Sequence, residues 1–131
     1  MQGYNFGYLH AECIPHEQAL KYYPDIDVML EQFVIGWFGA QAIECMFMRK
    51  VVVAYLHPDD LLQVPPEMIE GLPIISASPD KLDKVLIDII NGKYDLAHIG
   101  EMGRQFVIRQ NDPLKIATKL IKDYESVKGG K

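Results

Sequence analysis

The sequence predicts an α/β protein built around a small parallel sheet with helices on its faces. The segment 25–55 holds two apolar runs of strand length, at 27–30 and 51–55, and the second run is rich in β-branched valine. Between them, the apolar residues of 40–47 recur every three or four positions, which is the period of an α-helix. Two apolar strands joined by one helix form a βαβ crossover, the unit of a parallel sheet.

The composition predicts a single soluble domain covering residues 1–131. A chain of this length buries about two-thirds of its unfolded surface. Its net charge of −5 argues against binding to nucleic acid. The apolar runs are too short to span a bilayer, and the first residues do not resemble a signal peptide. The two cysteines cannot make a disulfide framework, so we expect a cytoplasmic protein without a membrane span.

The N-terminal part leads into the central unit. Residues 4–9 alternate aromatic and small side chains, which predicts a short strand. Pro15 opens a helix, because proline suits the first helical turn, and Tyr23 lies on the inner face of that helix. Pro24 ends the helix, and a strand over 26–30 follows.

The middle of the chain completes the predicted sheet. A helix over 38–49 leads to the strand over 51–55. The polar residues 57–60 follow the second strand at its carboxyl end and are a candidate site there, but a polar loop is the favoured interpretation. One helical turn is expected at 67–70. A short strand over 73–76 follows, with its proline at an edge or at the first strand position.

The C-terminal part is helical. An amphipathic stripe predicts a helix over 79–91. The segment 94–110 is also predicted to be helical, with a break near Gly100 and Gly103. A last helix over 113–125 has an apolar stripe, which predicts that it packs on the sheet.

The turn into the helix over 38–49 is the first place to look for function. Gly36, Trp37, Phe38 and Gly39 follow the first strand, and ligands of open α/β sheets bind at that end of the strands. Glycines allow close approach of a phosphate or a sugar, and helix N-termini favour anions. Glu44 follows among apolar neighbours, where a carboxylate needs a partner such as ribose hydroxyls. The alternative is an ordinary tight turn with Glu44 on a solvated face.

Two other groups of residues are weaker candidates. His10, Glu12, Cys13 and His16 lie close together in the sequence, but zinc sites use recognised spacings of four ligands, and no second Cys/His pair follows. The sequence therefore favours a protein without a metal. Cys45 lies on an apolar helix and is expected in the core rather than as a nucleophile.

The central segment resembles the signature of retaining glycosyltransferases with the GT-B fold, the group that includes glycogen and sucrose synthases. That family has a strand, a Gly-Phe-Gly-type turn, a helix that runs into Glu-Ala-Met-Ala, and then Gly-Lys-Pro-Val-Val. The matching stretches here are Gly36-Trp37-Phe38-Gly39, Glu44-Cys45-Met46 and Arg49-Lys50-Val51-Val52-Val53.

The likeness continues toward the C-terminus. Gly103-Arg104-Gln105-Phe106-Val107 is similar to the family's Gly-Arg-x-Tyr-Val, and Asn111-Asp112-Pro113 is similar to its His-Asp-Pro closing segment. The collinear similarity runs from about residue 14 to residue 124. It implies a Rossmann-like sheet belonging to a partial GT-B C-terminal domain, which binds the donor nucleotide-sugar.

The resemblance also assigns roles to residues. The family uses the second glutamate of a Glu-x7-Glu pair to hold the nucleotide ribose, and this glutamate maps onto Glu44. The first glutamate, which touches the donor sugar, maps onto Gly36. The resemblance therefore implies ribose binding by Glu44 and leaves the sugar contact without its usual residue.

The likeness covers only part of a GT-B enzyme. The chain matches roughly the last two-thirds of the donor domain, without the strands that carry the diphosphate-binding Arg and Lys and without an acceptor domain. We therefore expect weak binding of a nucleotide-sugar or nucleoside diphosphate, no cofactor, and no catalysis without a partner or the missing segment. The alternative is a non-catalytic module for binding or oligomerisation. Because the strand over 27–30 would lack its usual neighbour, a homodimer is expected.

Overall fold

The computed structural model describes residues 3–130 and contains one sheet of three parallel strands in the order β1-β2-β3. Val28 is in register with Val51, and Val53 is in register with Ile75. The strands lie inside the three predicted ranges, so the α/β prediction with a small parallel sheet is confirmed. Their bounds are Val28–Leu30 for β1, Val51–Ala54 for β2 and Ile75–Ser76 for β3.

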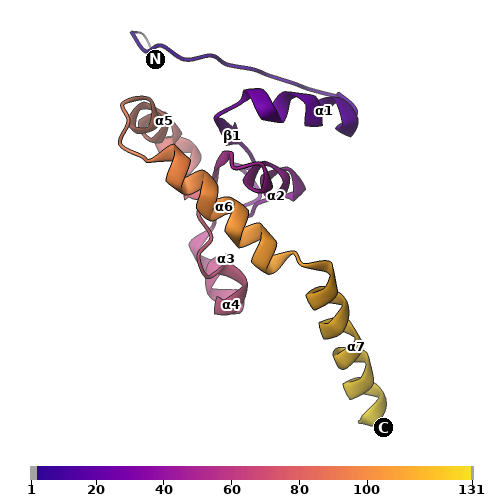
Figure 1. Ribbon diagram of the computed structural model, residues 1–131. Helices are drawn as coiled ribbons and strands as arrows, with labels where there is room; N and C mark the ends of the chain where they lie inside the picture. The colour runs from indigo at the N-terminus through magenta and orange to yellow at the C-terminus, as the bar shows by residue number, and fades with distance from the viewer. Residues whose placement is uncertain (1–2, 131) are drawn as a thin grey trace.

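Helices connect the strands and form most of the remaining structure (Figure 1). They are α1 (His16–Tyr22), η1 (Tyr23–Asp25), α2 (Ala40–Phe47), α3 (Pro58–Gln63), α4 (Pro66–Ile69), η2 (Pro79–Lys81), α5 (Leu82–Ile90), α6 (Leu96–Gln110) and α7 (Pro113–Gly129).

The core has two parts, one on each face of the sheet, because side chains alternate along β2. Val52 and Ala54 contribute to a buried cluster with Met46 of α2 and Phe106 of α6. Val53 contributes to the other cluster, which includes Ile89 of α5. The sheet is therefore covered by helices on both faces, as the crossover pattern predicts.

Helix α6 lies against α2 because it has glycines at the contact. A Cβ atom at Gly100 would overlap the carbonyl oxygen of Arg49, and one at Gly103 would lie 3.2 Å from the Cβ of Met46. The predicted break at these glycines is wrong, since α6 runs unbroken through both. The missing side chains let two helices approach closely and do not interrupt the helix.

Two arginines fix the C-terminal end of α2. The Nη1 atom of Arg104 donates a hydrogen bond to the Phe47 carbonyl oxygen over 2.7 Å, and its guanidinium carbon lies 4.3 Å from the centre of the Phe47 ring. Arg49, in the turn before β2, has φ of 62° and pairs with Glu101 of α6 over 2.6 Å. This turn therefore depends on α6 as well as on its own sequence.

The N-terminal segment does not form the predicted strand. Residues 4–9 adopt neither helix nor strand and are largely exposed, and Figure 1 shows the chain running extended before α1. Among residues 3–130, β1 pairs only with β2. The prediction of a strand at 4–9 is wrong because no neighbouring strand supplies its backbone with hydrogen bonds. One edge of β1 is left open.

The segment after β2 is more helical than expected. Residues 58–63 form α3 instead of part of a polar loop. His57 is its N-cap, with Nδ1 accepting a hydrogen bond from the Asp59 N–H over 3.2 Å, and Pro58 occupies the first helical turn. Helix α4 forms near the single turn expected at 67–70.

The last helix, α7, begins as predicted but packs differently. Asp112 caps it by accepting a hydrogen bond from the Leu114 N–H over 2.9 Å. No residue of α7 is buried, and Figure 1 shows it projecting away from the other elements. The predicted packing of this helix on the sheet is therefore wrong.

Among residues 3–130, no helix has the length and apolar character needed to cross a bilayer.

Candidate functional site

The carboxyl end of the sheet is formed by the loop after β1 and the segment after β2. The Tyr55 N–H donates a hydrogen bond to the Gln32 carbonyl oxygen over 3.1 Å, and the His57 N–H donates one to the Gly36 carbonyl oxygen over 2.8 Å. Gly36 has φ of 83°, and a Cβ atom there would lie only 2.9 Å from the Cβ of His57. A glycine is required at this position by both its backbone angle and its close neighbour.

Glu31 occupies the start of α2, where an anionic ligand was expected. It directly follows β1 and is only 7% exposed. Both of its carboxylate oxygens accept a hydrogen bond from the Gly39 N–H, over 3.0 and 3.1 Å. Burial raises the pKa of the Glu31 carboxyl, although the Gly39 N–H opposes that rise. The Gly39 N–H is therefore bound to the protein's own carboxylate.

The aromatic residues of the turn lie against each other. The rings of Trp37 and Phe38 stack with centroids 5.1 Å apart and planes 25° from parallel. Phe38 packs against the buried cluster beneath α2. Val34 and Ile35, which precede the turn, are highly exposed. The turn is thus anchored on one side and presents an apolar surface on the other.

Glu44 lies on α2 with its side chain directed toward the N-terminal helices. Its Oε1 atom is 3.1 Å from Nε2 of His16 in α1. Its Oε2 atom is buried and has no hydrogen-bond partner among residues 3–130. We expected this carboxylate to need a polar partner. In the structure, Oε1 has His16 as its partner and Oε2 makes no hydrogen bond to a described residue.

Tyr23 and Cys45 lie close to this carboxylate. Burial and then the neighbouring Cys45 and Glu44 raise the pKa of the Tyr23 hydroxyl to about 12. The Tyr23 hydroxyl lies close enough to the Glu44 carboxylate for the carboxylate to act on it as a hydrogen-bond acceptor, but these two buried groups do not reach good hydrogen-bond geometry. Burial, followed by Glu44 and Glu31, raises the pKa of the Cys45 thiol to about 12. The thiol stays protonated near neutral pH, so Cys45 belongs to the core and is not a nucleophile.

The structure brings only some of the predicted site residues together. Gly39 caps α2 and binds Glu31, and Glu44 lies further along the same helix. Glu31 and Glu44 both contribute to the raised pKa of the Tyr23 hydroxyl and of the Cys45 thiol. Gly36 instead packs on His57. Sequence reasoning missed Glu31, although an acidic residue directly after a strand at the ligand-binding end was a usable signal.

The charges at this end of the sheet are mainly negative. Asp59 and Asp60 in the first turn of α3 add to the buried Glu31, and the Asp60 carboxylate approaches Gly36. Residues 3–130 contain no group of three or more His, Cys, Asp or Glu side chains placed to hold a metal ion. A nucleotide here would meet acidic groups rather than a cradle for phosphate.

Comparisons of the chain with protein-family models, with curated proteins and with solved structures give no match.

Proposed function

We propose that the chain is the donor-nucleotide half of a GT-B-like retaining glycosyltransferase, which holds the nucleoside part of a nucleotide-sugar and requires a partner for catalysis. The observation that carries this proposal is the partly satisfied carboxylate of Glu44, which has the Tyr23 hydroxyl as a neighbour but leaves Oε2 without a hydrogen bond of good geometry to a described residue. A buried carboxylate oxygen without a donor is costly, and ribose offers two hydroxyl donors. His16 would have to leave Oε1 for ribose to bind, and its side chain is 59% exposed.

The turn before β2 is consistent with the same resemblance. Arg49 stands where the family motif has glycine, and it keeps the left-handed backbone, with φ of 62°, that glycine adopts easily. A non-glycine residue rarely takes this conformation without support. The ion pair with Glu101 supplies such support. A left-handed residue is common directly after a helix, so this turn is compatible with the motif but is not specific to it.

The acidic carboxyl end explains why a partner is needed. Donor phosphates carry negative charge, and the carboxylates of Glu31, Asp59 and Asp60 would repel them. In this proposal, basic groups that hold the diphosphate come from a separate glycosyltransferase subunit or from a second copy of the chain.

A second function is favoured by Glu31 and Gly36. Glu31 already uses the Gly39 N–H, and the positive φ of Gly36 disfavours the glutamate that touches the donor sugar in the family. These features fit a non-catalytic module that keeps the fold for binding or oligomerisation. Nucleotide titration separates the two functions, since the module would not bind nucleoside diphosphates at the Glu44 position.

Glu44→Ala should weaken the binding of uridine or adenosine diphosphate by about 1–3 kcal/mol, the scale for losing hydrogen bonds to a charged group. Calorimetry measures the affinity, and fluorescence of Trp37, the only tryptophan, which lies in the turn before α2, gives an independent readout. Glu125→Ala is the matched control, because it removes an exposed carboxylate from α7.

His16→Ala sharpens this experiment. It frees Oε1 of Glu44, so the variant should bind nucleoside diphosphate at least as tightly as the unmodified chain. Equal affinity of the Glu44→Ala variant and the unmodified chain, with unchanged circular dichroism, would contradict the role of Glu44. Absence of binding by every variant would favour the non-catalytic module.

Incubated alone with nucleotide-sugars, the chain should transfer no sugar and should hydrolyse the donor slowly at most. The physical reason is that the carboxylates of Glu31, Asp59 and Asp60 at the carboxyl end of the sheet would repel the diphosphate. Chromatographic detection of released nucleoside diphosphate checks this. Turnover at roughly 1 per second, within the ordinary enzymatic range, would show that the chain needs no partner.

A further inference from the structure

Helix α7 presents a long apolar face that no other described element covers. It has 17 residues, and none of them is buried. Leu114 is 79% exposed, Tyr124 is 73% exposed and Val127 is 70% exposed. An apolar face of this size on a projecting helix is typical of a surface that binds another protein.

The spacing on this face is that of a coiled coil. Ala117, Leu120, Tyr124 and Val127 alternate between steps of three and four residues, which places them at the a and d positions of two heptads. Ile116 and Ile121 flank them at g and e and widen the face. The charged and hydroxyl-bearing residues at positions b, c and f lie away from it: Lys115, Thr118, Lys119, Lys122, Glu125 and Ser126.

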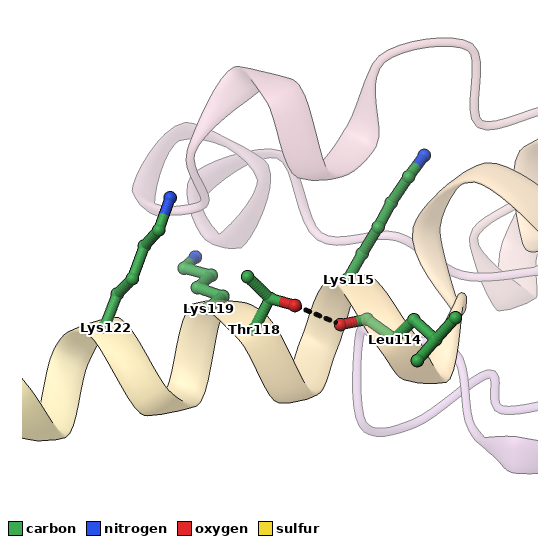
Figure 2. A pocket seen from close by; sticks show the side chains of 5 residues that line it. All are labelled: Leu114, Lys115, Thr118, Lys119 and Lys122. Atoms are coloured by element: carbon green, nitrogen blue, oxygen red, sulfur yellow. Dashed lines mark hydrogen bonds between the residues drawn. The ribbon is translucent and has the colours of Figure 1, made fainter.

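Figure 2 shows part of the polar side of α7. Lys115, Lys119 and Lys122 stand off the helix on the same side as Thr118, whose hydroxyl donates a hydrogen bond to the Leu114 carbonyl oxygen over 2.8 Å. Because these three lysines lie on the polar side, their charges would not repel those of a second helix that packs on the apolar face. The helix thus has one side suited to water and one suited to a partner helix.

The remaining charges indicate what the partner is. Asp123 falls at a g position and Lys128 at the following e position. In a parallel pair, the g residue of one helix lies opposite the e residue of the other helix that is five positions further along. Asp123 of each copy would therefore lie opposite Lys128 of the other copy, which gives two ion pairs. The g and e positions one heptad earlier, Ile116 and Ile121, meet as an apolar pair. An antiparallel pair would instead match g with g and e with e, so that the two Asp123 carboxylates would repel each other and Lys128 would face Leu114.

We propose that two copies of this chain associate in parallel through α7, with Ala117, Leu120, Tyr124 and Val127 in the seam and Asp123–Lys128 pairs at its border. This surface is independent of the open edge of β1. It also does not depend on nucleotide binding.

Sedimentation equilibrium over the micromolar range should show a reversible dimer of the 14.9 kDa chain. Leu120→Glu should raise the dissociation constant by at least about thirtyfold, because the two-fold axis puts two charges into the seam. Thr118→Glu adds the same charge on the polar side and should leave the dissociation constant nearly unchanged. Helix α7 has no buried residues, so neither variant should unfold the domain, and circular dichroism checks this.

A charge exchange tests the parallel arrangement. Asp123→Lys alone and Lys128→Asp alone should each weaken the dimer by about three- to tenfold, since each replaces an attraction with a repulsion. The double variant Asp123→Lys with Lys128→Asp should restore the original affinity. The proposal is overturned by a single-chain mass at all concentrations, by a dimer that tolerates Leu120→Glu, or by a double variant that stays as weak as the single ones.

Discussion

Gly100→Ala should lower the free energy of unfolding by about 3 kcal/mol or more, which is the upper range for forcing extra atoms into a packed contact. The new Cβ atom would overlap the carbonyl oxygen of Arg49, a backbone atom that cannot rotate away. Either α6 must move off α2 or the turn before β2 must shift. Urea denaturation followed by far-ultraviolet circular dichroism measures the loss.

Two other glycines provide controls for that experiment. Gly129 lies in α7, and a Cβ atom there would meet no other atom within 4 Å. Gly129→Ala should therefore be neutral or stabilise the helix by up to about 1 kcal/mol. Gly103→Ala should fall between the two, because its Cβ would meet side-chain atoms of Met46 at 3.2 Å. Equal effects of all three substitutions would contradict the close-packing explanation.

Gly36→Glu should lower the free energy of unfolding by about 2–4 kcal/mol, the sum of backbone strain at positive φ and overpacking. This substitution introduces the glutamate that the glycosyltransferase motif has at this position. At Gly36, however, φ is 83° and the Cβ of His57 would be 2.9 Å from the new Cβ. The motif residue is therefore incompatible with the loop as it is folded here.

Two alanine variants separate the causes. Gly36→Ala should cost nearly as much as Gly36→Glu, since both add the Cβ atom. Gly92 has a similar φ of 75° but open space around its Cβ position, so Gly92→Ala should cost only the strain of about 1–2 kcal/mol. Chemical denaturation of the three variants gives the comparison. A Gly36→Ala variant no weaker than Gly92→Ala would show that the contact with His57 relaxes easily.

The parallel sheet could be predicted because its signal is local. The valines of β2 and the helical period of α2 lie within one short segment, and a βαβ crossover has few alternative arrangements. The predicted strand at 4–9 failed because a strand needs a neighbour, which its own residues do not encode. The predicted helix break at Gly100 and Gly103 failed for a similar reason, because the role of these glycines is set by distant residues. Their role depends on Arg49 and Met46, which lie about fifty residues away in the sequence.

The candidate site was predictable only in part. The glycine turn and Glu44 stood out from their spacing and their apolar neighbours. The contact of Glu31 with Gly39 depends on a side chain folding across the loop after β1, and no periodic pattern reports such a contact. The approach of His16 to Glu44 joins two helices that the sequence places on either side of β1. Both contacts change what the site offers to a ligand.

Because α1 is weakly anchored, a ligand can reach Oε1 of Glu44 only in the fraction of molecules in which α1 has moved away. Helix α1 has no buried residue of its own, and Tyr23 in η1 is the nearest buried side chain that holds it. Elements with so little buried surface open at a free energy well below that of global unfolding. A ligand that needs Oε1 of Glu44 would bind only the open fraction of molecules, so its apparent dissociation constant would exceed the intrinsic one by the inverse of that fraction. The affinity for a nucleotide would then be set as much by the N-terminal helix as by the site beneath it.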